Sequence, residues 1–167
     1  MPKKEIYIIL HNVRSRFNVG SIFRTADGAG ISKIYLCGIT PAPPHPKIAK
    51  VALGAENFVP FASVKNAWQL IAKLKKQGIQ IIAVEQDEKS INYQKFQPKY
   101  PLAIVLGSET KGLSPAILKR CDSIIEIPMH GKKESLNVAT AGGIVCFHFT
   151  SPLAAPKKNH SANINSL

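Results

Sequence analysis

Short apolar runs recur along the chain and predict a set of buried strands. Five mostly apolar runs stand out, at residues 6–10, 33–37, 80–84, 102–106 and 123–127. Strands that are covered on both faces of a parallel sheet read as continuous apolar segments rather than as an alternation of apolar and polar positions. A further run at residues 58–62 contains a proline, which cannot donate to a sheet ladder, so it is predicted as an edge strand at most.

Segments with helical spacing of their apolar residues alternate with these strands. They predict helices over residues 18–29, 47–53, 63–76 and 114–120, with Asn18, Ser63 and Ser114 as N-caps and Gly30, Gly54 and Gly78 as stops. The core face of the third helix is predicted to hold Ala67, Trp68, Leu70, Ile71 and Leu74. Because the chain opens as strand, helix, strand, the sequence predicts an α/β fold with a parallel sheet flanked by helices.

The last helix is predicted to begin near Ser135, a good N-cap residue, and to run to about residue 150. Apolar side chains cover most of its circumference, which predicts burial on most sides. Before it, Pro128 ends the last strand and residues 130–134 form a polar, basic loop. A strand end, a basic loop and a helix N-terminus would therefore meet, and free backbone N–H groups there can bind a ligand.

The charge of the chain indicates a polyanionic partner. The 167 residues carry 22 Lys and Arg against 10 Asp and Glu, a net charge of +12. RNA or DNA is the simplest partner for such a surface, and the alternative is a soluble basic protein without a polyanionic partner.

The composition changes after residue 151 to Pro, Lys, Asn and Ser. We therefore expect one domain over residues 1–151 and a basic, disordered tail over residues 152–167.

Several functional classes fit the sequence poorly. No signal peptide or membrane-spanning run is visible. The three cysteines, Cys37, Cys121 and Cys146, lack metal-like spacing, and we expect them to be buried thiols in a reducing cytoplasm. Residues 107–114 have the glycine spacing of a P-loop, but Leu113 occupies the position of the phosphate-binding lysine. No G-x-G-x-x-G follows the first strand, and no Cys/His cluster supports a metal site.

Three segments together resemble a known family. Residues 18–30 (NVGSIFRTADGAG), 104–114 (IVLGSETKGLS) and 127–139 (IPMHGKKESLNVA) are similar to motifs 1, 2 and 3 of the SpoU or TrmH-like branch of the SPOUT methyltransferases, in the family's order. The resemblance spans about residues 6–150. It implies a parallel α/β sheet with a C-terminal trefoil knot, bound S-adenosylmethionine (AdoMet), a homodimer, and methyl transfer to a ribose 2′-hydroxyl of RNA.

The resemblance also implies site residues. Matching motif positions assign the catalytic roles to Asn18, Arg24, Glu109, Ser135 and Asn137. The cofactor is expected against Val84, Gly107, Ile127, Met129, Ser135 and Leu136. Nearby basic residues are candidates for phosphate contacts: Arg14, Arg16, Lys111, Lys132 and Lys133. The family often treats the Arg24 position as a general base, but arginine does not ordinarily deprotonate, so clamping a phosphate and polarising the hydroxyl fits its chemistry better.

Alternatives remain open at this point. Asn18 and Ser135 could act only as helix caps, Arg24 could be an ordinary surface residue, and the basic side chains could be solvated charges. The chain shows no N-terminal RNA-binding extension, which favours a compact folded tRNA as substrate, with ribosomal RNA as the alternative. A catalytically silent RNA-binding protein and a base methyltransferase with Cys121 as nucleophile are the competing functions.

Overall fold

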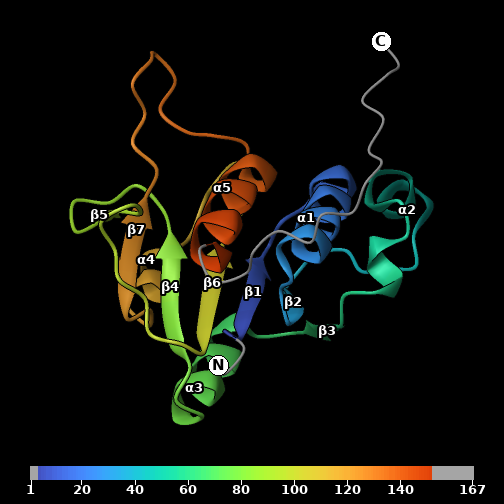
Figure 1. Ribbon diagram of the computed structural model, residues 1–167, viewed down its shortest axis with the longest axis horizontal. Helices are drawn as coiled ribbons and strands as arrows, with labels where there is room; N and C mark the ends of the chain where they lie inside the picture. Colours follow the sequence, from blue (N-terminus) through green and yellow to red (C-terminus); the bar gives the residue numbers. More distant parts are fainter. Residues whose placement is uncertain (1–3, 152–167) are drawn as a thin grey trace.

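Seven parallel strands form the central layer of the computed structural model, which describes residues 4–151 (Figure 1). The strands are β1 (Ile6–His11), β2 (Lys33–Cys37), β3 (Phe61–Val64), β4 (Gln80–Val84), β5 (Ile91–Asn92), β6 (Leu102–Leu106) and β7 (Ser123–Glu126). Their order in the sheet is β3-β2-β1-β6-β4-β7-β5. The five apolar runs are confirmed as strands, and the proline-containing run is confirmed as an edge strand that begins later, at Phe61.

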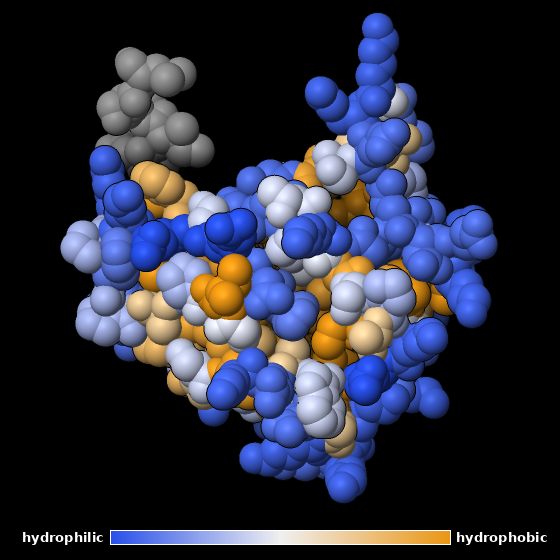
Figure 2. Space-filling model, turned by 180° about the vertical axis from the view of Figure 1, so that it is seen from behind, coloured by the Kyte–Doolittle hydropathy of each residue, from blue (hydrophilic) through white to orange (hydrophobic). Residues whose placement is uncertain are grey.

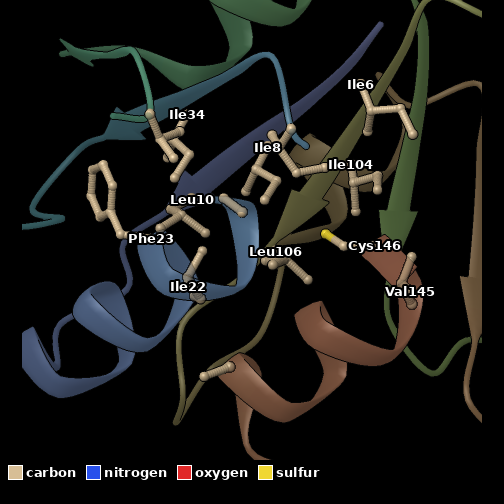
Figure 3. Packing of buried hydrophobic residues seen from close by; sticks show 14 of the residues in the cluster. Ile6, Ile8, Leu10, Ile22, Phe23, Ile34, Ile104, Leu106, Val145 and Cys146 are labelled. Atoms are coloured by element: carbon tan, nitrogen blue, oxygen red, sulfur yellow. The ribbon is translucent and has the colours of Figure 1, made fainter. Parts of the chain in front are cut away.

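Helices cover both faces of the sheet. One face carries α1 (Arg16–Ala29), α2 (Pro46–Ala52), the 3-10 helix η1 (Ala55–Asn57) and α5 (Val138–Thr150), and the other carries α3 (Ala67–Lys76) and α4 (Pro115–Leu118). Figure 3 shows side chains of α1 and α5, among them Phe23 and Cys146, on the same side of the sheet as Leu10 of β1 and Leu106 of β6. The predicted α/β class with a parallel, two-sided sheet is confirmed.

Three predicted helix N-caps are wrong by two or three residues. Ser15, rather than Asn18, caps α1, and its hydroxyl accepts the Asn18 N–H at 3.2 Å. Ser63 lies inside β3, because pairing with β2 extends to Val64, and Asn66 takes the cap position of α3. Asn137 replaces Ser135 as the cap of α5, since its side chain accepts the Ala139 and Thr140 N–H groups. Sequence patterns locate helices better than their ends.

Two predicted burials are also corrected. Trp68 lies outside the core face of α3, with 47% of its surface exposed, and the Arg120 guanidinium stands 5.7 Å from its ring centroid. The final helix is buried mainly on one side, where Val145, Cys146 and Phe149 pack, while Phe147 is 47% exposed. The three cysteines match expectation more closely, because Cys37 and Cys146 are buried and Cys121 is half-buried.

The last helix is enclosed by segments from distant parts of the chain. On one side α5 packs against α1, where the Phe147 ring lies 3.4 Å from a Cβ built on Gly28. On another side, the connection from β4 to β6 contacts it: Tyr93 packs edge-on to His148 at 4.9 Å, and the Tyr100 hydroxyl donates to the Phe149 carbonyl at 2.9 Å. The end of the described chain is therefore fixed by residues that precede it by about fifty positions.

Close contact between α1 and α2 depends on Gly20. A Cβ at this position would lie 2.6 Å from the Ile48 carbonyl oxygen and 3.1 Å from the Val51 Cβ. Gly20→Val should therefore destabilise the fold by about 1–3 kcal/mol or more, because backbone of α2 must move. Urea unfolding measures this difference. Gly28→Ala in the same helix is the matched control, since its Cβ meets an ordinary 3.4 Å contact; equal stability of Gly20→Val and the wild type would contradict the prediction.

Candidate functional site

A large cavity opens at the carboxyl ends of β4, β6 and β7. It has a volume of about 660 Å³ and is lined by residues that follow these strands and by the start of α5. All six residues predicted to contact a cofactor line it: Val84, Gly107, Ile127, Met129, Ser135 and Leu136. In Figure 1 the segment between β7 and α5 rises beyond these strand ends, and in Figure 2 it stands out as a mostly hydrophilic projection.

The topology of the sheet explains why a cavity forms there. The chain builds β1, β2 and β3 outward in one direction and then crosses to β4 on the other side of β6. In open parallel sheets, ligands bind outside the carboxyl ends of the strands near such a reversal. This strand order brings residues 84–86, 106–113 and 126–141 to one place.

Gly107 lets the chain turn sharply against itself at the cavity wall. A Cβ built on Gly107 would lie 2.6 Å from the Gly112 carbonyl carbon, 2.7 Å from its oxygen and 2.8 Å from the Leu113 Cγ. Ser108 and Gly112 close the turn through backbone hydrogen bonds of 3.0 and 3.3 Å. Any larger residue must open this turn, which lines the cavity along its whole length.

Glu85 is a residue of the cavity wall that the sequence patterns did not reveal. Its Oε2 accepts the Leu113 N–H at 3.1 Å, and its Oε1 accepts the Gln86 N–H at 2.9 Å. The carboxylate therefore ties the 107–113 turn to the end of β4. A signal existed in the sequence, because Glu85 is an acidic residue directly after a buried strand, at the ligand-binding edge of a parallel sheet.

Glu109 organises a hydrogen-bond network that joins all three motif segments. Its carboxylate accepts the Arg14 and Ser15 N–H groups at 3.1 and 3.0 Å and the Asn18 side-chain amide at 3.0 Å. Asn18 in turn accepts a 3.1 Å hydrogen bond from the Asn137 side chain, whose own oxygen caps α5. Burial raises the pKa of Glu109, but these hydrogen bonds outweigh it and hold the pKa below the ordinary value of 4.5.

The other two predicted catalytic residues stand outside this network. Arg24 is exposed on α1, on the side away from the buried Val19, Phe23 and Ala26. The oxygens of Glu109 accept hydrogen bonds from groups other than Arg24. Ser135 is exposed and lines the cavity. The structure therefore brings Asn18, Glu109 and Asn137 together and leaves Arg24 free to meet a ligand from solvent.

The five residues predicted to contact phosphate are all exposed, and one of them lines the cavity. Lys111 lines the cavity itself, and Lys132 and Lys133 lie in the projecting segment. Arg14 and Arg16 flank Ser15 at the start of α1, beside the Glu109 carboxylate. These positions suit contacts to a polyanion that reaches the cavity from outside.

Other chemistries lack support in the described residues. Burial raises the pKa of the Cys121 thiol to about 12, and this thiol bonds the Ile117 carbonyl away from the cavity, which argues against a cysteine nucleophile. Within residues 4–151, no group of His, Cys, Asp and Glu could hold a metal ion. In the same range, the longest apolar helices are too short or too polar to span a bilayer.

The lowered pKa of Glu109 predicts a pH-dependent stability. Its folded pKa is below its unfolded pKa, so ionised Glu109 stabilises the fold above pH 4.5, and this stabilisation is lost as pH falls through the folded value. Glu109→Gln should therefore unfold at a lower temperature than the wild type near neutral pH, and the difference in unfolding temperature should narrow as the pH falls below 4.5. Thermal unfolding across this range tests it; a gap that is independent of pH would assign the effect to packing.

Comparison with known proteins gives a consistent set of relatives. The profile of the SpoU rRNA Methylase family matches residues 5–147. The chain is 34% identical to the 23S rRNA (guanosine-2′-O-)-methyltransferase RlmB of Vibrio parahaemolyticus, over 91% of this chain and 61% of that protein. It is 32% identical to the tRNA (guanosine(18)-2′-O)-methyltransferase of Aquifex aeolicus, over 87% and 68% respectively. The chain spans 58–61% of the length of the first two curated relatives.

Solved structures show the same fold. The AdoMet-bound rRNA methyltransferase from Sinorhizobium meliloti superposes with a TM-score of 0.86 at 30% identity, covering 92% of this chain and 59% of that one. The TrmH/SpoU tRNA modifying enzyme of Aquifex aeolicus gives a TM-score of 0.80 at 29% identity.

Proposed function

Since this chain belongs to the SpoU rRNA Methylase family, we propose that it transfers a methyl group from AdoMet to a ribose 2′-hydroxyl of RNA. One observation carries the proposal. The 660 Å³ cavity at the strand ends is lined mainly by motifs 2 and 3, and the Glu109–Asn18–Asn137 network ties both motifs to the α1 helix that bears Arg24. Relatives with this fold are named as 2′-O-methyltransferases of rRNA and tRNA.

The residues of the cavity fit AdoMet by their chemistry. Leu106, Ile127, Leu136 and Val138 offer apolar surface to a purine ring, and the 107–113 turn brings backbone close to the ligand. When bound, AdoMet supplies an electrophilic methyl group on a sulfonium centre. The chain's part is to hold the hydroxyl oxygen in line and to exclude water, since positioning accounts for much of the rate of such transfers.

Arg24 is proposed to clamp the RNA phosphate and polarise the 2′-hydroxyl. A guanidinium donates five N–H bonds in a fixed fork and does not act as a base at ordinary pH. Its exposed position on α1 supports a role that is completed only when RNA arrives. Ser135, at the cavity, and the Asn18–Asn137 pair are proposed to orient the reacting ribose beside it.

Two further features of the family are proposed for this chain. A C-terminal trefoil knot is supported by the placement of α5 between α1 and the β4–β6 connection, through contacts to Tyr93 and Tyr100. A homodimer is supported by exposed apolar side chains on α1 and α5, Phe17 at 52% and Phe147 at 47%. Light scattering of the full chain tests the dimer: a monomer at micromolar concentration would contradict it.

The RNA is proposed to be a tRNA, with rRNA as the alternative, and the protein is proposed to act in the cytoplasm. The chain covers 68% of the tRNA-modifying relative from Aquifex aeolicus and 61% of the rRNA-modifying relative from Vibrio parahaemolyticus, which favours tRNA.

Residues 152–167 lie outside the described residues, and we retain the prediction of a basic, disordered tail. Removing them should leave the unfolding temperature unchanged and weaken RNA binding most at low salt. Unchanged affinity at low salt would make the tail a bystander.

Transfer of labelled methyl from AdoMet to total RNA of a strain that lacks this gene tests the function. The RNA is size-separated and hydrolysed with alkali. Label in an alkali-resistant dinucleotide within one RNA band establishes ribose methylation and identifies the RNA class. Label in an alkali-sensitive nucleotide would move the chemistry to a base. Absence of label with folded protein and bound AdoMet would favour a silent RNA-binding protein.

A further inference from the structure

A second cavity lies at α2 and the chain segments on either side of it. It has a volume of about 440 Å³ and is lined by the proline-rich segment before α2, by α2 itself and by η1 and β3. Its walls are Pro43, Pro44, His45, Pro46, Ile48, Ala49, Glu56, Asn57 and Phe61. In Figure 1, α2 lies at the opposite end of the sheet from β5, so this cavity is separate from the one at β4, β6 and β7.

Glu56, one of the residues that line this cavity, has a carboxylate oxygen without a partner among the described residues. The Oε2 of Glu56 is screened from solvent and has no hydrogen-bond partner within residues 4–151. A carboxylate oxygen in this position costs free energy, because it loses water without gaining a donor. Among the side chains that line the cavity, only His45 and Asn57 carry N–H donors, and neither donates to the Glu56 Oε2. A ligand could supply the donor that this carboxylate lacks.

A hydrogen-bond donor lines the same cavity. The His45 Nδ1 accepts the Lys47 N–H at 3.1 Å as it caps α2, which assigns the proton of the neutral ring to Nε2. The site thus combines an unsatisfied acceptor, a donor and flat apolar surface from Phe61 and the prolines. Guanine matches this set: its N1–H and N2–H groups are adjacent donors for a carboxylate, and O6 accepts. Adenine does not match, since its N1 would place an acceptor against the carboxylate.

The position of the cavity suits an RNA nucleotide. Lys47 and Lys50 are exposed on α2 and can contact phosphates, while Phe58, which follows Asn57, is 75% exposed and can stack on a base. Gly20 packs against α2 one helical turn before Arg24, so the helix that lines this cavity contacts the helix that bears the proposed catalytic residue. Single-stranded RNA bases are commonly read in this way, by stacking and by hydrogen bonds to the Watson–Crick edge.

We propose that this cavity binds an unpaired guanine base of the substrate RNA, with Glu56 as the residue that selects it. The proposal rests on the proposed function and deepens it by naming a base-reading site apart from the cofactor cavity. A carboxylate repels phosphate, so its presence on a strongly basic chain suits base recognition, with Lys47 and Lys50 taking the backbone.

Titration of the full chain with guanosine 5′-monophosphate, followed by amide NMR shifts, tests the site. We expect shifts at Ala49 and Asn57, no comparable shifts with adenosine 5′-monophosphate, and affinity that is at least about ten-fold weaker in Glu56→Gln. Glu88→Gln, an exposed acidic residue that lines neither cavity, is the matched control and should bind as the wild type does. Equal binding of both nucleotides, or unchanged affinity in Glu56→Gln, would overturn the proposal.

Thermal unfolding separates recognition from a structural role of Glu56. Because its buried oxygen has no partner, Glu56→Gln should unfold at the same or a higher temperature than the wild type. A lower unfolding temperature would assign Glu56 to the fold and count against the proposal. A chain that transfers methyl to RNA but binds no guanosine monophosphate here would overturn this inference alone. A chain that binds the nucleotide here but transfers no methyl would overturn only the proposed activity.

Discussion

Replacing Arg24 with alanine is expected to lower methyl transfer to RNA by at least about 10³-fold while AdoMet affinity stays within a few-fold of the wild type. The reason is that Arg24 and the proposed cofactor contacts lie in different parts of the site. Arg24 is exposed on α1 and does not line the cavity at β4, β6 and β7, so the proposed cofactor contacts survive its removal. The lost guanidinium takes away the donors that would hold the phosphate and polarise the 2′-hydroxyl.

Single-turnover transfer with saturating RNA, together with AdoMet binding by calorimetry, measures the two effects separately. Arg120→Ala is the matched control, because Arg120 is also exposed but lies after α4, on the other face of the sheet, with its guanidinium over Trp68. It should transfer methyl at close to the wild-type rate. Normal turnover in Arg24→Ala would remove this residue from the mechanism.

Gly107→Ala should abolish measurable AdoMet binding, with an expected loss of at least about 10²-fold in affinity. The added methyl would stand 2.6 Å from the Gly112 carbonyl carbon and 2.8 Å from the Leu113 Cγ, so the turn must open. Opening displaces the same backbone that lines the cavity and pulls on the hydrogen bond from Leu113 to Glu85. Backbone cannot yield as a side chain would, which makes the effect large for a single methyl group.

Calorimetric titration of AdoMet into the variant measures this loss, and circular dichroism checks that the fold persists. Gly131→Ala is the matched control within the projecting segment, since a Cβ there meets nothing within 4 Å. It should bind AdoMet as the wild type does. Wild-type affinity in Gly107→Ala would place the cofactor elsewhere than against this turn.

The sequence predicted more of the fold than of its contacts. Continuous apolar runs predict doubly covered strands, because no other arrangement buries both faces of a strand, and each such run forms a strand at or within one residue of its expected place. Caps were less predictable: Asn18, Ser63 and Ser135 are all good N-cap residues, but neighbouring Ser15, Asn66 and Asn137 take that position. Local preference cannot separate several good caps a few residues apart.

The sequence by itself determined six of the seven strands, the helices between them, the basic charge and the three motif segments, because each depends on residue type and local spacing. Only the tertiary structure decided that Glu109 binds Asn18, that Asn137 joins them, and that Glu85 anchors the 107–113 turn. These partners lie 28 to 119 positions apart in the chain. Such contacts follow from the crossing order of the parallel strands, which sets which strand ends become neighbours and which no local pattern encodes.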